Sequence, residues 1–173
     1  MLTYNIRPSL ETDYSGIYSL IKTAFETAKV KDGDEQDFAT NLRNSSGYIP
    51  ELDFVAEKDC MLIGHIMFTK RYVAKANGLQ EEMLLVAPLS VLLEYRNKGV
   101  GSALMKEGLK RAKELGYKAA FLAGDPGYYS RFGYKQSAAY GIVNANGIPH
   151  EFVMVYLIKP DALDSVEGTI SLA

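Results

Sequence analysis

The sequence is poor in the residues that build disulfides and metal sites. Its 173 residues include one cysteine, Cys60, and two histidines, His65 and His150. One thiol cannot close an internal disulfide, and it cannot form the multi-cysteine cage of a structural zinc site. The composition therefore predicts no metal, and it is typical of a reducing compartment such as the cytoplasm.

Long apolar runs and an excess of one charge are also missing. No apolar segment approaches the roughly 20 residues that span a bilayer, and residues 1–16 lack the basic-then-apolar order of a secretory signal. Nineteen basic residues against 21 acidic ones give a formal net charge of -2, whereas nucleic-acid binders usually carry a basic excess. We therefore expect neither a membrane nor a nucleic acid as a partner, and we expect any anion site to be local.

What is present predicts one mixed α/β domain over residues 1–173. No repeat divides the chain, and no linker rich in Gly, Pro or Ser does so; the length suits one compact domain. Apolar residues spaced three and four apart predict a helix after Asp13 as its cap, and further helices over about 34–44 and 100–115. Strands are expected at 4–7, 54–57, 61–73, 83–91, 118–123 and 152–158, with a polar loop over 29–34 and a brief helix over 128–132. This order gives a sheet with an antiparallel meander at its centre.

Three short signals refine this order. The dipeptide Asn77-Gly78 between apolar runs predicts a hairpin turn. Pro88 inside the strand over 83–91 predicts a bulge or a local splay near residues 87–90. Gly116 is the stop signal of the helix over 100–115, whose apolar face extends to Leu115.

The turn before that helix carries the clearest chemical signal. A strand ending in Leu89-Ser90-Val91 leads to Arg96-Asn97-Lys98-Gly99-Val100-Gly101-Ser102. A helix N-terminus leaves backbone N–H groups without partners and carries a partial positive charge. The glycines let a diphosphate approach the backbone, and Arg96 and Lys98 add charge, so residues 96–102 form a candidate anion cradle that needs no metal.

Other phosphate-binding loops fit this turn less well. A P-loop requires Lys-Ser or Lys-Thr after its second glycine, which this sequence lacks. The dinucleotide-binding fingerprint would need glycine or alanine at the position of Leu104. Taken alone, Gly99-Val100-Gly101 also fits a turn whose glycines serve only packing.

Two segments resemble the signatures of the GNAT N-acetyltransferase superfamily. Residues 89–104, LSVLLEYRNKGVGSAL, are similar to its acyl-CoA signature, an apolar strand followed by Arg/Gln-x-x-Gly-x-Gly/Ala. Residues 129–134, YSRFGY, resemble its second signature. The opening Ile6-Arg7-Pro8 and the run Leu62-Ile63-Gly64-His65-Ile66 on the third strand are also typical of the superfamily. The run GDPGYYSRFG over 124–133 narrows the resemblance to the bacterial YhbS-like subgroup of predicted acetyltransferases. Leu93 departs from the proline that many members carry there.

The resemblance implies a single-domain GNAT-like mixed sheet with a splayed parallel strand pair and about four helices. It also implies an enzyme that transfers an acetyl group from acetyl-CoA to an amine by direct attack, without metal or covalent intermediate. The diphosphate is expected on residues 97–102, and the pantetheine arm along Leu89, Ser90 and Val91. The N–H of Val91 or its neighbour would polarise the thioester carbonyl, and Tyr129 would protonate the departing thiolate.

Several points stay open at this stage. Either Tyr128 or Tyr129 could instead only pack on the sheet. Candidates for a general base are His65, Glu57, Asp125 and His150, and the sequence assigns none of them. His65 lies in an otherwise apolar strand and is better explained as a hydrogen-bonded structural histidine, and Asp125, before Pro126, could instead only fix a turn. The acceptor, a small-molecule or peptide amine, the use of other acyl groups and self-association as a homodimer are not decided by the sequence. The alternative function is a catalytically silent CoA-binding regulatory or interaction module.

Overall fold

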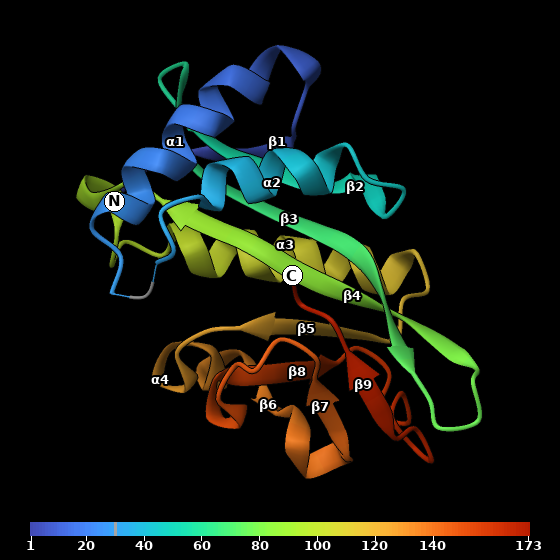
Figure 1. Ribbon diagram of the computed structural model, residues 1–173. Coiled ribbons are helices and arrows are strands. Elements are labelled where there is room, and N and C mark those ends of the chain that lie inside the picture. Colours follow the sequence, from blue (N-terminus) through green and yellow to red (C-terminus); the bar gives the residue numbers. More distant parts are fainter. Residues whose placement is uncertain (30) are drawn as a thin grey trace. The chain divides into compact units, whose positions relative to one another are not determined.

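The computed structural model describes residues 1–29 and 31–173 (Figure 1). Residue 30, in the predicted loop over 29–34, lies outside the described residues. The first half of the chain contains β1 (Asn5–Pro8), α1 (Tyr14–Glu26), α2 (Glu35–Arg43), β2 (Tyr48–Lys58), β3 (Met61–Ala74), β4 (Gln80–Val91) and α3 (Val100–Glu114). The second half contains β5 (Ala119–Ala123), α4 (Pro126–Tyr129), β6 (Lys135–Gln136), β7 (Ile142–Asn144), β8 (Val153–Leu157) and β9 (Gly168–Ile170).

The strands form a mixed sheet in the order β1-β2-β3-β4-β5-β8-β6, and β9 pairs with β3 and β7. The pairs β1–β2, β2–β3, β5–β8 and β6–β8 are antiparallel. The pairs β4–β5 and β7–β9 are parallel. The four α-helices of the described chain and this mixed sheet confirm the predicted fold class.

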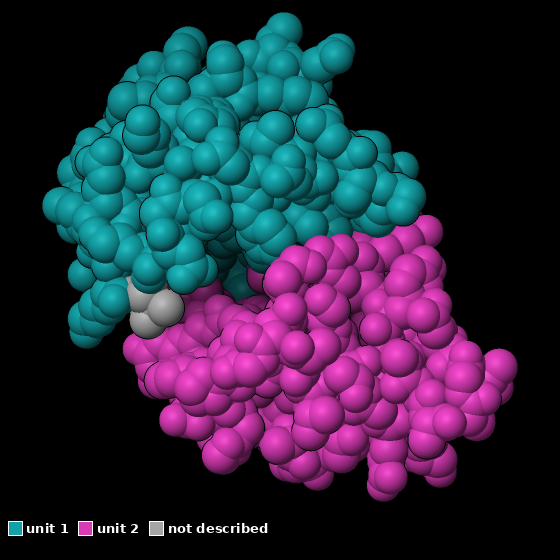
Figure 2. All heavy atoms as spheres, viewed as in Figure 1, with its two compact units in different colours: residues 1–69, 87–111 teal, residues 70–86, 112–173 magenta. Residues whose placement is uncertain are grey.

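The contacts of the chain fall into two compact units, which Figure 2 colours separately. Unit 1 contains residues 1–69 and 87–111, and unit 2 contains residues 70–86 and 112–173. The elements β3, β4 and α3 contribute residues to both units.

In unit 1, helices lie on both faces of the strands (Figure 1). Two glycines allow the close approach of α3 to β3. A Cβ on Gly108 would lie 2.2 Å from the Phe68 ring, and a Cβ on Gly64 would lie 2.9 Å from the Leu104 side chain. Neighbouring residues of a strand point to opposite faces, so His65, next to Gly64, points away from α3. On that other face, His65 and Arg43 of α2 both contact the carboxylate of Asp53.

In unit 2, the parallel pairing of β4 with β5 covers two residue pairs, Leu84 with Ala120 and Leu85 with Phe121. β5 pairs with β8 over five residues, from Ala119 to Ala123. Pro88 lies beyond the part of β4 that pairs with β5, and its peptide bond with Ala87 is cis. The short pairing is consistent with the splay predicted for this strand pair.

Some sequence-based expectations were wrong. Asp13 does not cap α1 with its side chain; its carboxylate instead accepts from Arg7 and from the N–H of Leu10. Leu115 is 40% exposed and lies outside α3. The strand β9 was not predicted at all, because three residues give no readable alternation, and its pairing is set by β3 and β7.

Candidate functional site

The turn before α3 has a backbone shape that suits glycine. Asn97 has φ of 59° and Gly99 has φ of 85°, both in the left-handed region. A Cβ on Gly99 would meet no protein atom within 4 Å. Residues 97–99 are exposed, so the backbone of this turn is open to a ligand.

The first turn of α3 presents backbone N–H groups at the same place. The N–H of Ala103 donates to the carbonyl of Gly99 over 3.0 Å. The N–H groups ahead of it, on Val100, Gly101 and Ser102, have no acceptor within the helix. Because the helix dipole adds partial positive charge there, these groups can bind a phosphate.

The two basic side chains of the turn lie in different surroundings. Lys98 is exposed, and its Nζ lies 5.8 Å from the centre of the Tyr95 ring. Arg96 instead binds main-chain carbonyls: its Nε donates to Val91 over 3.0 Å, and its Nη2 donates to Ala24 in the last turn of α1 over 2.5 Å. Arg96 therefore fastens the turn to the end of β4 and to α1.

The end of β4 brings Leu89, Ser90 and Val91 to the start of this turn. Ser90 is buried, whereas Leu89 and Val91 are half-buried. The Ser90 hydroxyl is buried without a hydrogen-bond partner among the described residues. Beyond Val91, the N–H of Leu92 donates to Ile63 of β3 over 3.0 Å, which ties the end of the strand to the sheet.

Tyr129 ends α4 in unit 2, inside a group of aromatic rings. Its ring centre lies 4.8 Å from that of Tyr128, 6.5 Å from Phe132 and 5.9 Å from Tyr134. Burial raises the pKa of the Tyr129 phenol well above its ordinary value, and Tyr128 and Asp125 add to the rise. The hydroxyl is therefore protonated at neutral pH and can donate a proton.

Most candidate bases are engaged in local structure. Glu57 accepts from Arg7 over 2.7 Å, and Asp125 accepts from the N–H of Gly127 over 2.9 Å at the start of α4. His150 is exposed and lies 3.6 Å from the carboxylate of Glu151. These contacts give no reason to prefer any of the three as a base.

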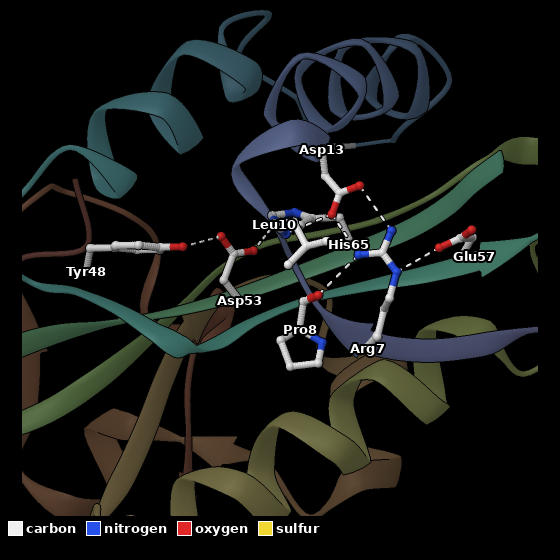
Figure 3. Close-up of polar contacts among 8 residues, drawn as sticks. All are labelled: Arg7, Pro8, Leu10, Asp13, Tyr48, Asp53, Glu57 and His65. Carbon is white, nitrogen blue, oxygen red and sulfur yellow. Dashed lines mark hydrogen bonds and ion pairs between the residues drawn. The ribbon is translucent and has the colours of Figure 1, made fainter. Parts of the chain in front are cut away.

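The fourth candidate, His65, belongs to a buried polar network (Figure 3), as expected for a hydrogen-bonded structural histidine, whereas sequence reasoning missed its partner Asp53. Its Nε2 lies 2.7 Å from Asp53, which also accepts from Tyr48 over 2.9 Å and from Arg43 over 3.2 Å. Asp53 and His65 are both fully buried. The signal in the sequence was an acid between Leu52 and Phe54, a polar residue inside an apolar strand.

The charges of this network lower the pKa of Asp53. Burial by itself would raise it, but the hydrogen bond from His65 and the charge of Arg43 outweigh burial and lower the pKa to about 2. Asp53 is thus ionised across the physiological range. The network connects α2, β2 and β3, and these contacts indicate a structural role for His65.

The described residues contain neither a group of metal ligands nor a helix that could cross a membrane. Within residues 1–29 and 31–173, no three His, Cys, Asp or Glu side chains gather in a way that could hold a metal ion. No helix in that part of the chain has the length and apolarity to cross a membrane.

Comparisons with known proteins identify the family. The acetyltransferase (GNAT) domain family matches residues 5–137. N-acetyltransferase YhbS of Escherichia coli is 30% identical over 166 residues, which cover 95% of this chain and 93% of YhbS. N-acetyltransferase YjhQ of Escherichia coli is 30% identical over 128 residues, which cover 74% of this chain and 67% of YjhQ.

Solved structures agree with this match. The crystal structure of YhbS from Escherichia coli in complex with CoA is similar with a TM-score of 0.87 and 30% identity, over 99% of this chain and 90% of that one. A GNAT family acetyltransferase from Brucella melitensis in complex with acetyl-CoA is similar with a TM-score of 0.78 and 26% identity, over 97% and 94% of the two chains. The chain belongs to the GNAT family of acetyltransferases, as the two signatures of its sequence predict.

Proposed function

We propose that this protein transfers the acetyl group of acetyl-CoA to the amine of an acceptor by direct attack. The observation that carries the proposal is the exposed turn at residues 97–99, where Lys98 lies next to the first N–H groups of α3, which have no acceptor within the helix. The complexes of the YhbS and Brucella melitensis relatives with CoA and acetyl-CoA support it. Residues 1–173 would act as one acetyltransferase domain, since β3, β4 and α3 run through both compact units.

The diphosphate of the cofactor would bind Asn97, Lys98, Gly99 and the N–H groups of residues 100–102. Hydrogen bonds to an ionised phosphate are stronger than hydrogen bonds between neutral groups, and the donors of this cradle can form them without a metal. Arg96 would contribute by holding the turn, because two of its nitrogens already donate to carbonyls. The backbone of Leu89, Ser90 and Val91 would bind the pantetheine arm and polarise the thioester carbonyl.

The reaction needs one proton donor for the leaving group. A bond forms between the amine nitrogen and the carbonyl carbon, and the C–S bond breaks with its electron pair moving to sulfur. Tyr129 would give its hydroxyl proton to that sulfur. Solvent would receive the proton that the amine loses and would return one proton to the Tyr129 phenolate. The protonated phenol and the absence of its hydroxyl from the hydrogen bonds of the described residues support this role.

The direct test is acetyl-CoA turnover against a panel of small-molecule and peptide amines, read out as released thiol and as the mass of the acetylated amine. Cys60 is exposed and free, so the assay should use a Cys60→Ser background to remove the thiol of the protein. We expect turnover with a subset of the amines. CoA binding without turnover of any amine would favour the silent CoA-binding module instead.

The role of Tyr129 is tested by comparing Tyr129→Phe with Tyr128→Phe. Loss of a proton donor that acts only in the transition state should lower kcat by about 100-fold while both KM values change little. The matched Tyr128→Phe variant should stay near wild type. If Tyr128→Phe loses turnover and Tyr129→Phe keeps it, the two roles are exchanged.

Cellular location and self-association are separate from the proposed reaction. A cytoplasmic location stays a prediction from the single cysteine, and formation of a homodimer stays open. The amine panel is the experiment that identifies the acceptor.

A further inference from the structure

Gly124 lies so close to the ring of Tyr129 that the Cβ of any other residue would overlap with that ring. A Cβ built on Gly124 would lie 2.4 Å from Cε2 and 2.9 Å from Cδ2 of that ring. Separations under about 3 Å lie well inside the contact distance of two carbon atoms. The missing side chain therefore allows the ring to lie directly on the backbone at this position.

The backbone of Gly124 is itself held in place. It follows β5, and its N–H donates to the carbonyl of Phe152 over 2.9 Å. The Tyr129 ring also packs against Tyr128 and Tyr134 in T-shaped contacts, and Tyr134 is only 2% exposed. A ring displaced by a side chain at 124 would therefore have to move against packed neighbours.

No hydrogen bond among the described residues holds the Tyr129 hydroxyl. Its direction consequently depends on how the ring is packed. We propose that Gly124 positions Tyr129 for proton transfer, its missing side chain allowing the ring packing that aims the hydroxyl at the leaving thiolate. This inference rests on the proposed role of Tyr129 as proton donor.

The test measures kcat and both KM values for Gly124→Ala, Tyr129→Phe and the double variant, with the best amine of the panel. A misplacement of about 1 Å can cost up to about 100-fold in rate, so Gly124→Ala should lower kcat by about tenfold or more at nearly constant KM. Because both changes act on one proton transfer, the double variant should be no slower than Tyr129→Phe alone.

Gly127→Ala is the matched control. Gly127 lies in α4, as Tyr129 does, and a Cβ at this position would meet only the side chain of Asp125, at 3.3 Å. This variant should keep its kcat within about twofold of wild type, since the ring of Tyr129 is not touched.

The outcomes separate the two proposals. If Tyr129→Phe is slow and Gly124→Ala is as fast as wild type, the positioning role is wrong and the proton donor stands. If Tyr129→Phe is fast, both assignments fail although acetyl transfer remains. If the two losses multiply in the double variant, Gly124 acts independently of Tyr129 and the inference is overturned.

A stability measurement covers the case in which Gly124→Ala folds poorly. Tyr129→Leu removes the ring and should make room for the methyl group. Gly124→Ala should then lower the melting temperature in wild type but hardly at all in the Tyr129→Leu background. An equal decrease in both backgrounds would show that the ring is not what the methyl group meets.

Discussion

At single residues, glycine serves two different purposes in this protein. Gly99 supplies a positive φ beside open space, whereas Gly64 and Gly124 supply room for a neighbour. The sequence alone does not separate these purposes, because both appear as one letter. Only the first kind bears directly on how a cofactor would reach the backbone.

The first prediction compares Gly99→Ala with Gly78→Ala. Gly78 has φ of 83° and, like Gly99, no protein atom within 4 Å of a built Cβ. Both variants should lose about 1–2 kcal/mol of stability, because alanine is strained in the left-handed region. Only Gly99→Ala should also weaken CoA binding, by about tenfold or ~1.4 kcal/mol, measured by calorimetric titration. Equal CoA affinities of the two variants would remove Gly99 from the proposed cradle.

The surroundings of Arg96 could be predicted from the sequence only in part. Its position shortly before two glycines at a helix start predicted a charge in the anion cradle, whereas the structure shows its guanidinium donating to the carbonyls of Val91 and Ala24. Its partner at Ala24, 72 residues away, follows from tertiary packing and has no local pattern. The same holds for Asp53, whose three partners come from α2, β2 and β3.

Among the elements, α3 was the most readable because several signals agree. Its apolar spacing, its glycine-rich start and Gly116 at its end all indicate one helix. The N–H of Gly116 donates to Lys113 and that of Tyr117 to Ala112, which is a Schellman ending. The short strands β6, β7 and β9 carry no comparable signal, since two or three residues are held only by their neighbours.

The second prediction concerns the packing of α3 on β3. Gly108→Ala would place a Cβ 2.2 Å from the Phe68 ring, and overpacking of this kind costs about 1–3 kcal/mol. Gly16→Ala in α1 is the control, since its Cβ would meet only the end of the Leu62 side chain at 3.2 Å. Both changes gain about 1 kcal/mol of helix propensity, so we expect Gly108→Ala to unfold at lower urea and Gly16→Ala not to. If the Gly108→Ala loss persists in a Phe68→Leu background, the ring contact is not its cause.

For the molecule as a whole, the ion pairs of the described residues differ mainly in how deeply they are buried. Arg7 joins Asp13 and Glu57 near the surface, where its hydrogen bond lowers the pKa of Asp13. Asp53 differs, because it and its partner His65 are fully buried. A buried pair that loses one partner leaves an uncompensated charge, which is strongly destabilising. Asp53 should therefore dominate how stability responds to acid.

The last prediction is that acid removes the contribution of Asp53 between about pH 4 and pH 2. The pKa of Asp53 is lowered from 3.8 to about 2 on folding, so the folded state binds this proton less readily than the unfolded chain. The contribution is therefore fully present above pH 4, and it decreases as the pH falls through the folded pKa. A shift of this size corresponds to about 2 kcal/mol.

Urea unfolding of wild type and Asp53→Asn between pH 7 and pH 2 measures this contribution, because Asn keeps the shape of the side chain and removes its charge. At pH 7, Asp53→Asn should be less stable by about 3–5 kcal/mol, since Arg43 loses its buried partner. The gap should narrow by about 2 kcal/mol on going to pH 2, as wild type itself takes up the proton. A gap that stays constant across this range would mean that folding does not change the pKa of Asp53, and a gap that widens toward pH 2 would mean that Asp53 is protonated in the folded protein. In that case the network of Tyr48, Arg43 and His65 would be held by neutral hydrogen bonds, and its role in joining α2 to β2 and β3 would not depend on charge.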